Sequence, residues 1–170
     1  LDSALMNDLL IKNRTKNFDV ELIDKVGGAK KMLLAIKKGR TLGILPDQDA
    51  ADSESVVVEF FGKKVNWNCG ASVIAKKVDA LLLPAFVYQK GDKYAVRCFE
   101  PMDASTHSKE ELSAYQAKCC EEIIKFRPSE YFFFHKRFKR FYNEIYEWIL
   151  SVELCGIWGR ADKVWFYAGR

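Results

Sequence analysis

The sequence feature that most constrains the fold is a repeated change between two apolar periods. Residues 18–24 alternate apolar and polar side chains, residues 29–38 follow a helical period, and residues 41–46 return to an extended apolar run. Glycines separate the three segments, as they commonly do where a chain changes its secondary structure. A strand, a helix and a strand in this order normally form a right-handed crossover between parallel strands.

The same change of period continues along the chain and predicts an α/β fold. Shorter helices are expected over residues 1–13 and 70–78, and residues 90–93 indicate a hairpin turn. Ser108 and Glu111 form a capping-box pattern at the start of a long helix. We therefore expect a mixed, mostly parallel and mostly buried central sheet, flanked by helices and incomplete at the N-terminus. Its predicted strands are 19–24, 41–45, 55–60, 81–88 and 94–99, with main helices at 29–38 and 109–126.

Length and composition bound the possible classes of protein. The chain has 170 residues, of which 49% are hydrophobic and 29% charged, as in one globular domain with a substantial core. The net charge of +4 does not by itself indicate a partner. The five cysteines lack metal-ligand spacing, and we expect buried thiols in a reducing compartment. The longest charge-free apolar run, between Asp79 and Lys90, is about half as long as a membrane span.

The stretch ILPDQDA, residues 44–50, places two carboxylates and an amide directly after an apolar run. Turn chemistry is one explanation, because an Asp after a Pro commonly binds backbone amides. A metal site is a second, because Asp47 and Asp49 form a D-x-D pattern whose oxygens suit Mg²⁺ or Mn²⁺ on a sugar-nucleotide diphosphate. The protein would then be a metal-dependent glycosyltransferase, although its sequence contains no glycine-rich phosphate loop. The third explanation comes from the surrounding motifs.

These motifs occur in a recognisable order. NRTKN precedes the acidic stretch, and VVVEFFGKK, LLLPAFVY and PSEYFFFHKRFKR follow it. Over residues 1–142 the series resembles the C-terminal half of the bacterial lipid A late acyltransferases, the lauroyl/myristoyl family of the lysophospholipid acyltransferase superfamily. The combination of ILPDQDA, FFG and a final P-x-x-Y-x-x-x-H-x-R-F-K is specific. After FFG the sequence departs from the family, with KKVNWNCGAS in place of small residues rich in Thr and Pro.

The resemblance implies an activity and a set of substrate-binding residues. In that family a fatty acyl chain passes from acyl-carrier-protein to a hydroxyl of a lipid A precursor, without a metal or other cofactor, at the cytoplasmic face of the bacterial inner membrane. The acidic stretch matches a loop beside the active cleft, and Arg14 matches an arginine that meets anionic groups. The matched residues are Arg14, Asp47, Gln48, Asp49, Phe61, Gly62, His135, Arg137 and Lys139.

One family motif has no match in this chain. The superfamily's general base is the histidine of an H-x-x-x-x-D or H-x-x-x-x-E motif, but Leu112 stands five residues after His107 and Arg140 five after His135. General-base help typically contributes about 10²–10⁴-fold, so we expect this chain to be inactive alone. We expect residues 1–148 to be the C-terminal part of the enzyme domain, with its membrane anchor elsewhere. Residues 149–170 are expected to form a tail of unknown role.

Residues 131–142 combine aromatic rings with a cluster of cations around His135. A solvated helix face, a nucleic-acid surface and an anionic membrane surface are the alternatives. The modest net charge and the lack of a nucleic-acid motif favour the membrane surface, with a helix in the second half of 131–150. A non-catalytic anionic-lipid-binding domain therefore stays open. His135 itself suits either a packed, hydrogen-bonded position at the edge of an aromatic core or a contact with a phosphate or acyl-carrier group.

Overall fold

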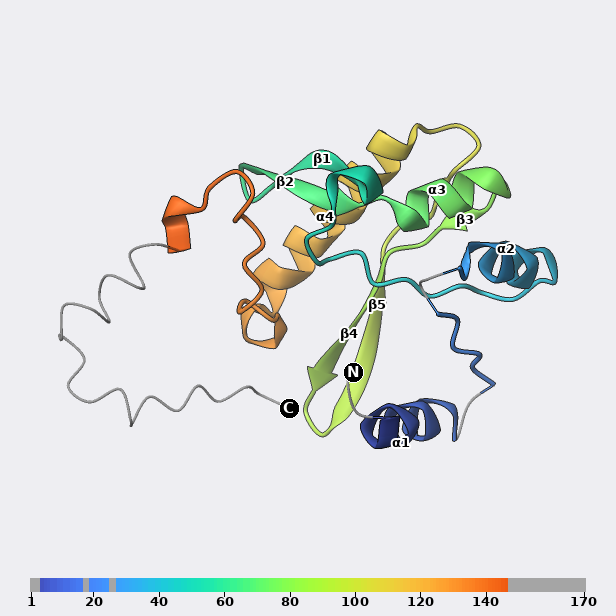
Figure 1. The fold of residues 1–170 in the computed structure, drawn as a ribbon. Coiled ribbons are helices and arrows are strands. Elements are labelled where there is room, and N and C mark those ends of the chain that lie inside the picture. The colour runs from blue at the N-terminus through green and yellow to red at the C-terminus, as the bar shows by residue number, and fades with distance from the viewer. Residues whose placement is uncertain (1–3, 17–18, 25–26, 147–170) are drawn as a thin grey trace. The chain divides into compact units, whose positions relative to one another are not determined.

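A computed structural model describes residues 4–16, 19–24 and 27–146 of the chain (Figure 1). The chain divides into two compact units, the first ending at Gly43 and the second beginning at Ile44. All strands of the described residues belong to the second unit. The predicted tail at 149–170 lies outside the described residues, so its boundary stays a prediction.

Two helices form the regular structure of the first unit, α1 (Ala4–Thr15) and α2 (Ala29–Lys37), and both were predicted. The predicted strands at 19–24 and 41–45 are wrong, because both segments are irregular. An extended segment becomes a strand only when a partner satisfies its backbone groups, and neither segment has one among the described residues. Alternating apolar side chains therefore did not suffice to make a strand.

The second unit begins its regular structure with a hairpin. Strand β1 (Ser55–Phe60) has the predicted bounds and pairs antiparallel with β2 (Lys63–Asn68), which was not predicted. The loop residues Phe61 and Gly62 have φ angles of 51° and 71°, and a tight type I′ turn needs positive φ at both positions. Gly62 adopts this conformation without steric cost. The FFG motif therefore consists of the last residue of β1, Phe60, and the two turn residues of this hairpin.

Helix α4 (Lys109–Phe126) packs against the hairpin and forms the main core with it (Figure 1). The helix begins at the predicted capping box, in which Glu111 N donates to Ser108 Oγ at 3.1 Å and Ser108 N donates to Glu111 Oε2 at 2.7 Å. Phe60 and Trp67 are only 2% and 1% exposed. The buried residues of this core are Val56, Val58, Phe60, Val65, Trp67, Cys69, Ala117, Cys120, Ile123 and Ile124.

The remaining elements surround a second, smaller core formed by Ala75, Leu82, Ala104 and Leu112. Helix α3 (Gly70–Lys77) packs against α4 at this core. Two short strands, β3 (Leu81–Leu82) and β6 (Met102–Asp103), pair antiparallel beside it. Strands β4 (Ala85–Lys90) and β5 (Lys93–Cys98) form an antiparallel hairpin around the predicted turn. Single turns of 3₁₀ helix occupy Asp52–Glu54 and Pro128–Glu130.

The α/β class is confirmed, but the predicted mixed, mostly parallel central sheet is wrong for the described residues. Their strands form three separate antiparallel pairs. The predicted strand at 81–88 is divided by residues 83 and 84, because Pro84 has no N–H for a ladder. Its predicted burial is also wrong, since Leu81 and Val87 are each 67% exposed.

Two further expectations are corrected in part. Cys69, Cys119 and Cys120 are buried as predicted, whereas Cys98 is exposed. Residues 131–141 run through turns, and the helix expected in the second half of 131–150 is present only at 144–146 within the described residues. No helix in the described part of the chain is long and apolar enough to cross a membrane.

Candidate functional site

The acidic loop, residues 47–49, lies between the irregular segment that precedes it and the first 3₁₀ turn of the second unit. Asp47 is half-buried and Gln48 is exposed. The Asp49 side chain is only 5% exposed. A carboxylate at this depth needs donors or a counter-charge. The partners of Asp49 therefore define the candidate site.

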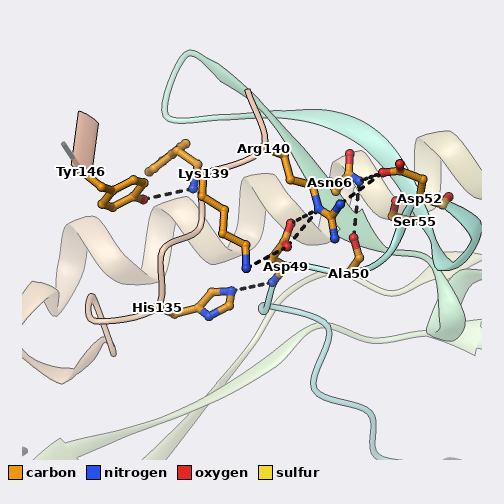
Figure 2. A network of polar contacts seen from close by, with 10 residues as sticks. Asp49, Ala50, Asp52, Ser55, Asn66, His135, Lys139, Arg140 and Tyr146 are labelled. Atoms are coloured by element: carbon orange, nitrogen blue, oxygen red, sulfur yellow. Dashed lines mark hydrogen bonds and ion pairs between the residues drawn. The ribbon is translucent and has the colours of Figure 1, made fainter. Parts of the chain in front are cut away.

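Asp49 is held by residues 131–142, which we name the basic segment, near the C-terminal end of the described chain (Figure 2). Arg140 Nε donates to both carboxylate oxygens at 2.9 and 3.0 Å, and Lys139 Nζ lies 3.9 Å from Oδ2. The backbone N–H of Asp49 donates to His135 Nε2 at 2.7 Å, across 86 residues of sequence. We name Asp49, His135, Lys139 and Arg140 the Asp49 clamp. The clamp brings together two of the three motifs that carried the family resemblance, the acidic loop and the C-terminal H-x-R-F-K.

The clamp continues into the hairpin through Asp52 (Figure 2). Arg140 Nη1 lies 3.6 Å from Asp52 Oδ1, which accepts a hydrogen bond from Asn66 Nδ2 at 2.6 Å. The same amide donates to the Ala50 carbonyl at 3.4 Å. Asn66 stands on β2 and is 3% exposed. The acidic loop is therefore tied to the core on one side and to the basic segment on the other.

His135 is half-buried and accepts a hydrogen bond in the clamp. Because Nε2 accepts from Asp49, the neutral ring carries its proton on Nδ1. Burial lowers the pKa of His135, the charge of Arg137 lowers it further, and the charge of Asp49 opposes both. The ring is therefore neutral at pH 7 with its Nε2 lone pair engaged. This geometry makes His135 a positioning residue of the acidic loop.

Arg137 lies within the basic segment but takes no part in the clamp. It is 4% exposed, and its Cζ lies 4.6 Å from the ring centroid of Trp67 and 5.8 Å from that of Phe60. The three guanidinium nitrogens and the Trp67 Nε1 are buried without a hydrogen-bond partner among the described residues. The expectation that all cations of this segment face a lipid surface is wrong for Arg137, because aromatic rings of the core enclose it.

The sequence-based prediction missed four residues of this site: Asp52, Asn66, Arg140 and Trp67. Trp67 is the one with a recognisable sequence pattern. It lies on β2, in the stretch that departs from the family pattern after FFG. The signal was available, since Val65 and Trp67 alternate with polar residues as in a strand with one buried face. Both side chains are at most 1% exposed.

Asp47 influences the ionisation of its buried neighbours. Burial raises the pKa of Tyr131 to about 12, and the charges of Cys120 and Asp47 add to the effect. Burial likewise raises the pKa of Cys120 to about 12, with Asp47 as the next contributor. Both groups are therefore protonated at neutral pH, and the Cys120 thiol is not a nucleophile in this state.

Three other predicted site residues make none of the clamp contacts. Arg14 is exposed near the end of α1, in the first unit. Phe61 and Gly62 form the hairpin turn, where Phe61 N donates to Glu121 Oε1 at 2.8 Å. The FFG motif contributes to the site through Phe60, whose ring lies beside the Arg137 guanidinium.

The acidic loop does not have the surroundings of a metal site. No group of three or more His, Cys, Asp or Glu side chains in the described ranges is arranged to hold a metal ion. Both carboxylate oxygens of Asp49 already accept hydrogen bonds from Arg140. A cation at Asp49 would have to displace this guanidinium, which counts against the metal-dependent glycosyltransferase.

Comparison with known proteins identifies the protein family. The model of the bacterial lipid A biosynthesis acyltransferases matches residues 1–140, and the chain belongs to this family. The lipid A biosynthesis lauroyltransferase of Escherichia coli strain K12 is 29% identical over 118 residues, which are 65% of this chain and 37% of that protein. The palmitoleoyltransferase of the same strain is 30% identical over 108 residues, 62% of this chain and 35% of its own length. The chain thus spans little more than a third of these relatives.

Proposed function

We propose that this chain is the C-terminal, substrate-binding portion of an enzyme that transfers a fatty acyl chain from acyl-carrier-protein to a hydroxyl of a lipid A precursor. The family match over residues 1–140 carries this proposal. In the reaction the hydroxyl oxygen bonds to the acyl carbon, the thioester bond breaks, and the carrier thiol receives the proton that the hydroxyl gives up. The proposed location is the cytoplasmic face of the bacterial inner membrane.

The Asp49 clamp has a definite task in this proposal. It neutralises Asp49 through Arg140 and fixes the backbone of the acidic loop through His135. Asp47 and the exposed Gln48 then remain as the polar side chains that orient the acceptor. A loop that is already held needs little reorganisation when the substrate arrives, which favours the reactive geometry.

The general base is proposed to come from outside these 170 residues. His135 Nε2 is engaged by Asp49, and the residue five positions further on is Arg140, where the family motif has an acid. The isolated chain is therefore expected to bind substrate without transferring the acyl group.

Two surfaces suit the proposed membrane and the proposed acyl donor. Phe132 and Phe133 are 59% and 61% exposed next to the exposed Lys136, and aromatic rings with cations favour an anionic lipid surface.

On α2 and its C-cap, four lysines are exposed, which suits an acidic acyl-carrier-protein. They are Lys30, Lys31, Lys37 and Lys38.

The test uses the full-length product of the reading frame that encodes these residues. It is incubated with a lipid A precursor and with acyl-carrier-protein that carries fatty acids of several lengths. The masses of the products are measured by mass spectrometry. We expect a product heavier by one acyl chain, an at least tenfold slower reaction for D47N, and an unchanged rate for D19N, an exposed control. No product from any acyl donor, or product from a nucleotide-sugar donor, would contradict the proposal.

A further inference from the structure

Arg137 is a buried cation whose hydrogen bonds the chain does not complete. Its Nε, Nη1 and Nη2 and the neighbouring Trp67 Nε1 all lack a partner within the described residues. Buried polar groups in proteins are almost always hydrogen-bonded, so several unpaired donors in one place need an explanation. Guanidinium and indole nitrogens only donate, which means that the missing partner is an acceptor.

The groups around Arg137 do not replace that acceptor. The Trp67 and Phe60 rings, with centroids 4.6 and 5.8 Å from Cζ, stabilise the positive charge through their faces but leave the N–H groups unpaired. Burial lowers the pKa of Arg137, and the carboxylates of Asp47 and Asp49 oppose this effect. Asp49 is already bound by Arg140, and Asp47 makes no hydrogen bond to Arg137.

We propose that Arg137 and Trp67 form a binding site for an oxyanion of the phosphate type. The planar guanidinium places parallel N–H groups toward two oxygens of one tetrahedral anion, and the indole N–H supplies a third donor. A hydroxyl or a carbonyl offers one oxygen and leaves most of these donors unpaired. Only an acceptor with several oxygens and a negative charge satisfies both the geometry and the charge.

The position of Arg137 links this site to the clamp. His135 and Lys139, two residues away on either side, both contact Asp49. The guanidinium nitrogens are closed to solvent, so an oxyanion reaches them only when the residues that enclose them move. The inference deepens the proposed function, because it assigns the same segment a phosphate-bearing ligand. It rests on that function only for the identity of the ligand.

The test is calorimetric titration of the 170-residue chain with inorganic pyrophosphate at low ionic strength. We expect saturable binding at one site, weakened about tenfold in R137K, which lacks the planar fork, and lost in R137Q. W67F keeps an aromatic ring beside the guanidinium and removes one donor, so it should bind about tenfold more weakly even if R137Q fails to fold. K118Q removes an exposed charge on α4 and should bind within about twofold of the parent, as a solvated surface cation contributes little.

The outcomes that overturn the proposal are distinct from failure of acyl transfer, because no acyl donor is present. Absence of saturable heat in the parent, or equal weakening by K118Q and R137K, would show only diffuse electrostatic attraction. The charge of Asp47 acts on Arg137 without a hydrogen bond and competes with an added anion, so D47N should bind pyrophosphate more tightly than the parent. Weaker binding by D47N would mean that Asp47 is not a competitor and would overturn the site as proposed.

Competition identifies the source of the oxyanion. Displacement of pyrophosphate by phosphatidylglycerol vesicles would indicate a membrane headgroup, and displacement only by a phosphorylated lipid A precursor would indicate the substrate. Either result supports the site. If neither of them displaces pyrophosphate, and inorganic phosphate does not displace it either, the proposed site is overturned.

Discussion

Two polar clusters in the second unit lie equally deep but differ in their hydrogen bonding. Between α3 and α4, Ser72 Oγ and Ser113 Oγ lie 2.8 Å apart, and Gln116 Nε2 donates to Ser72 Oγ at 2.9 Å. We name these three residues the serine–glutamine cluster. In the other cluster Arg137 and Trp67 are buried, but their side-chain N–H groups have no acceptor among the described residues. The first cluster is complete within the chain, and the second needs an added group.

This difference separates a structural role from a binding role. Neutral groups that hydrogen-bond one another fix the packing of two helices and need no ligand. Donors without an acceptor destabilise the folded chain until a ligand supplies one, and proteins tolerate such a cost mainly at functional sites. The Asp49 clamp lies between the two cases, because it is charged and yet complete within the chain.

The largest effect on stability is expected for D49N, which tests whether the clamp is complete. The variant removes the carboxylate, 5% exposed, that Arg140 and Lys139 share, and leaves Arg140 with the more exposed Asp52 at 3.6 Å. We expect the free energy of unfolding in urea to fall by about 2–3 kcal/mol. D19N is the matched control, because Asp19 pairs with Arg40 at 94% exposure and should contribute little. Equal effects of both variants would show that the clamp is no stronger than a surface ion pair.

The free energy of unfolding is expected to change in opposite directions when a polar side chain of each cluster is replaced by an apolar one. Burial lowers the pKa of Arg137, which means that the folded chain disfavours its charge despite the nearby carboxylates. In the absence of ligand, R137M should therefore raise the free energy of unfolding by about 1–2 kcal/mol. Q116M loses the hydrogen bonds to Ser72 and to the Leu112 carbonyl and should lower it by about 1 kcal/mol. Destabilisation by both variants would remove the contrast between the clusters.

The pH dependence of stability should follow the clamp and not the serine–glutamine cluster. The folded-state pKa of His135 lies below its ordinary value of about 6.5, so the unfolded chain binds its proton first as pH falls. The stabilisation from the neutral ring is complete above that value and is lost as pH falls through the folded-state pKa. In urea unfolding between pH 7 and 5, H135Q should flatten this decline, while Q116M should keep it. An unchanged slope in H135Q would place the pH dependence elsewhere.

Local sequence patterns predicted much of the second unit. The features that depend on contacts between residues distant in sequence were not predicted. The bounds of β1 and the capping box of α4 follow from side chains within a few positions of each other. The strands expected at 19–24 and 41–45 required partners that no local pattern supplies. The loop and the basic segment were predicted as site residues by resemblance, but the hydrogen bond from Asp49 to His135 crosses 86 residues. Arg137 is buried although charged side chains are usually exposed, which is why it was expected on a surface.

The smallest effect is expected from divalent cations. Both oxygens of Asp49 are bound by Arg140, so Mg²⁺ or Mn²⁺ would have to break the clamp in order to bind. Calorimetric titration with either ion should show no stoichiometric site. A site of micromolar affinity would contradict the account of the loop and would favour a glycosyltransferase.

A charge exchange between Asp49 and Arg140 tests most directly whether the clamp positions the acidic loop for acyl transfer. In the full-length protein, D49R and R140D are each expected to lower the rate of transfer to a lipid A precursor at least tenfold, because each leaves two like charges together. The double variant restores an ion pair, and the backbone hydrogen bond to His135 is retained, so most of the lost rate should return. Single variants with the parent's rate, or a stably folded double variant as slow as the singles, would contradict this role of the clamp.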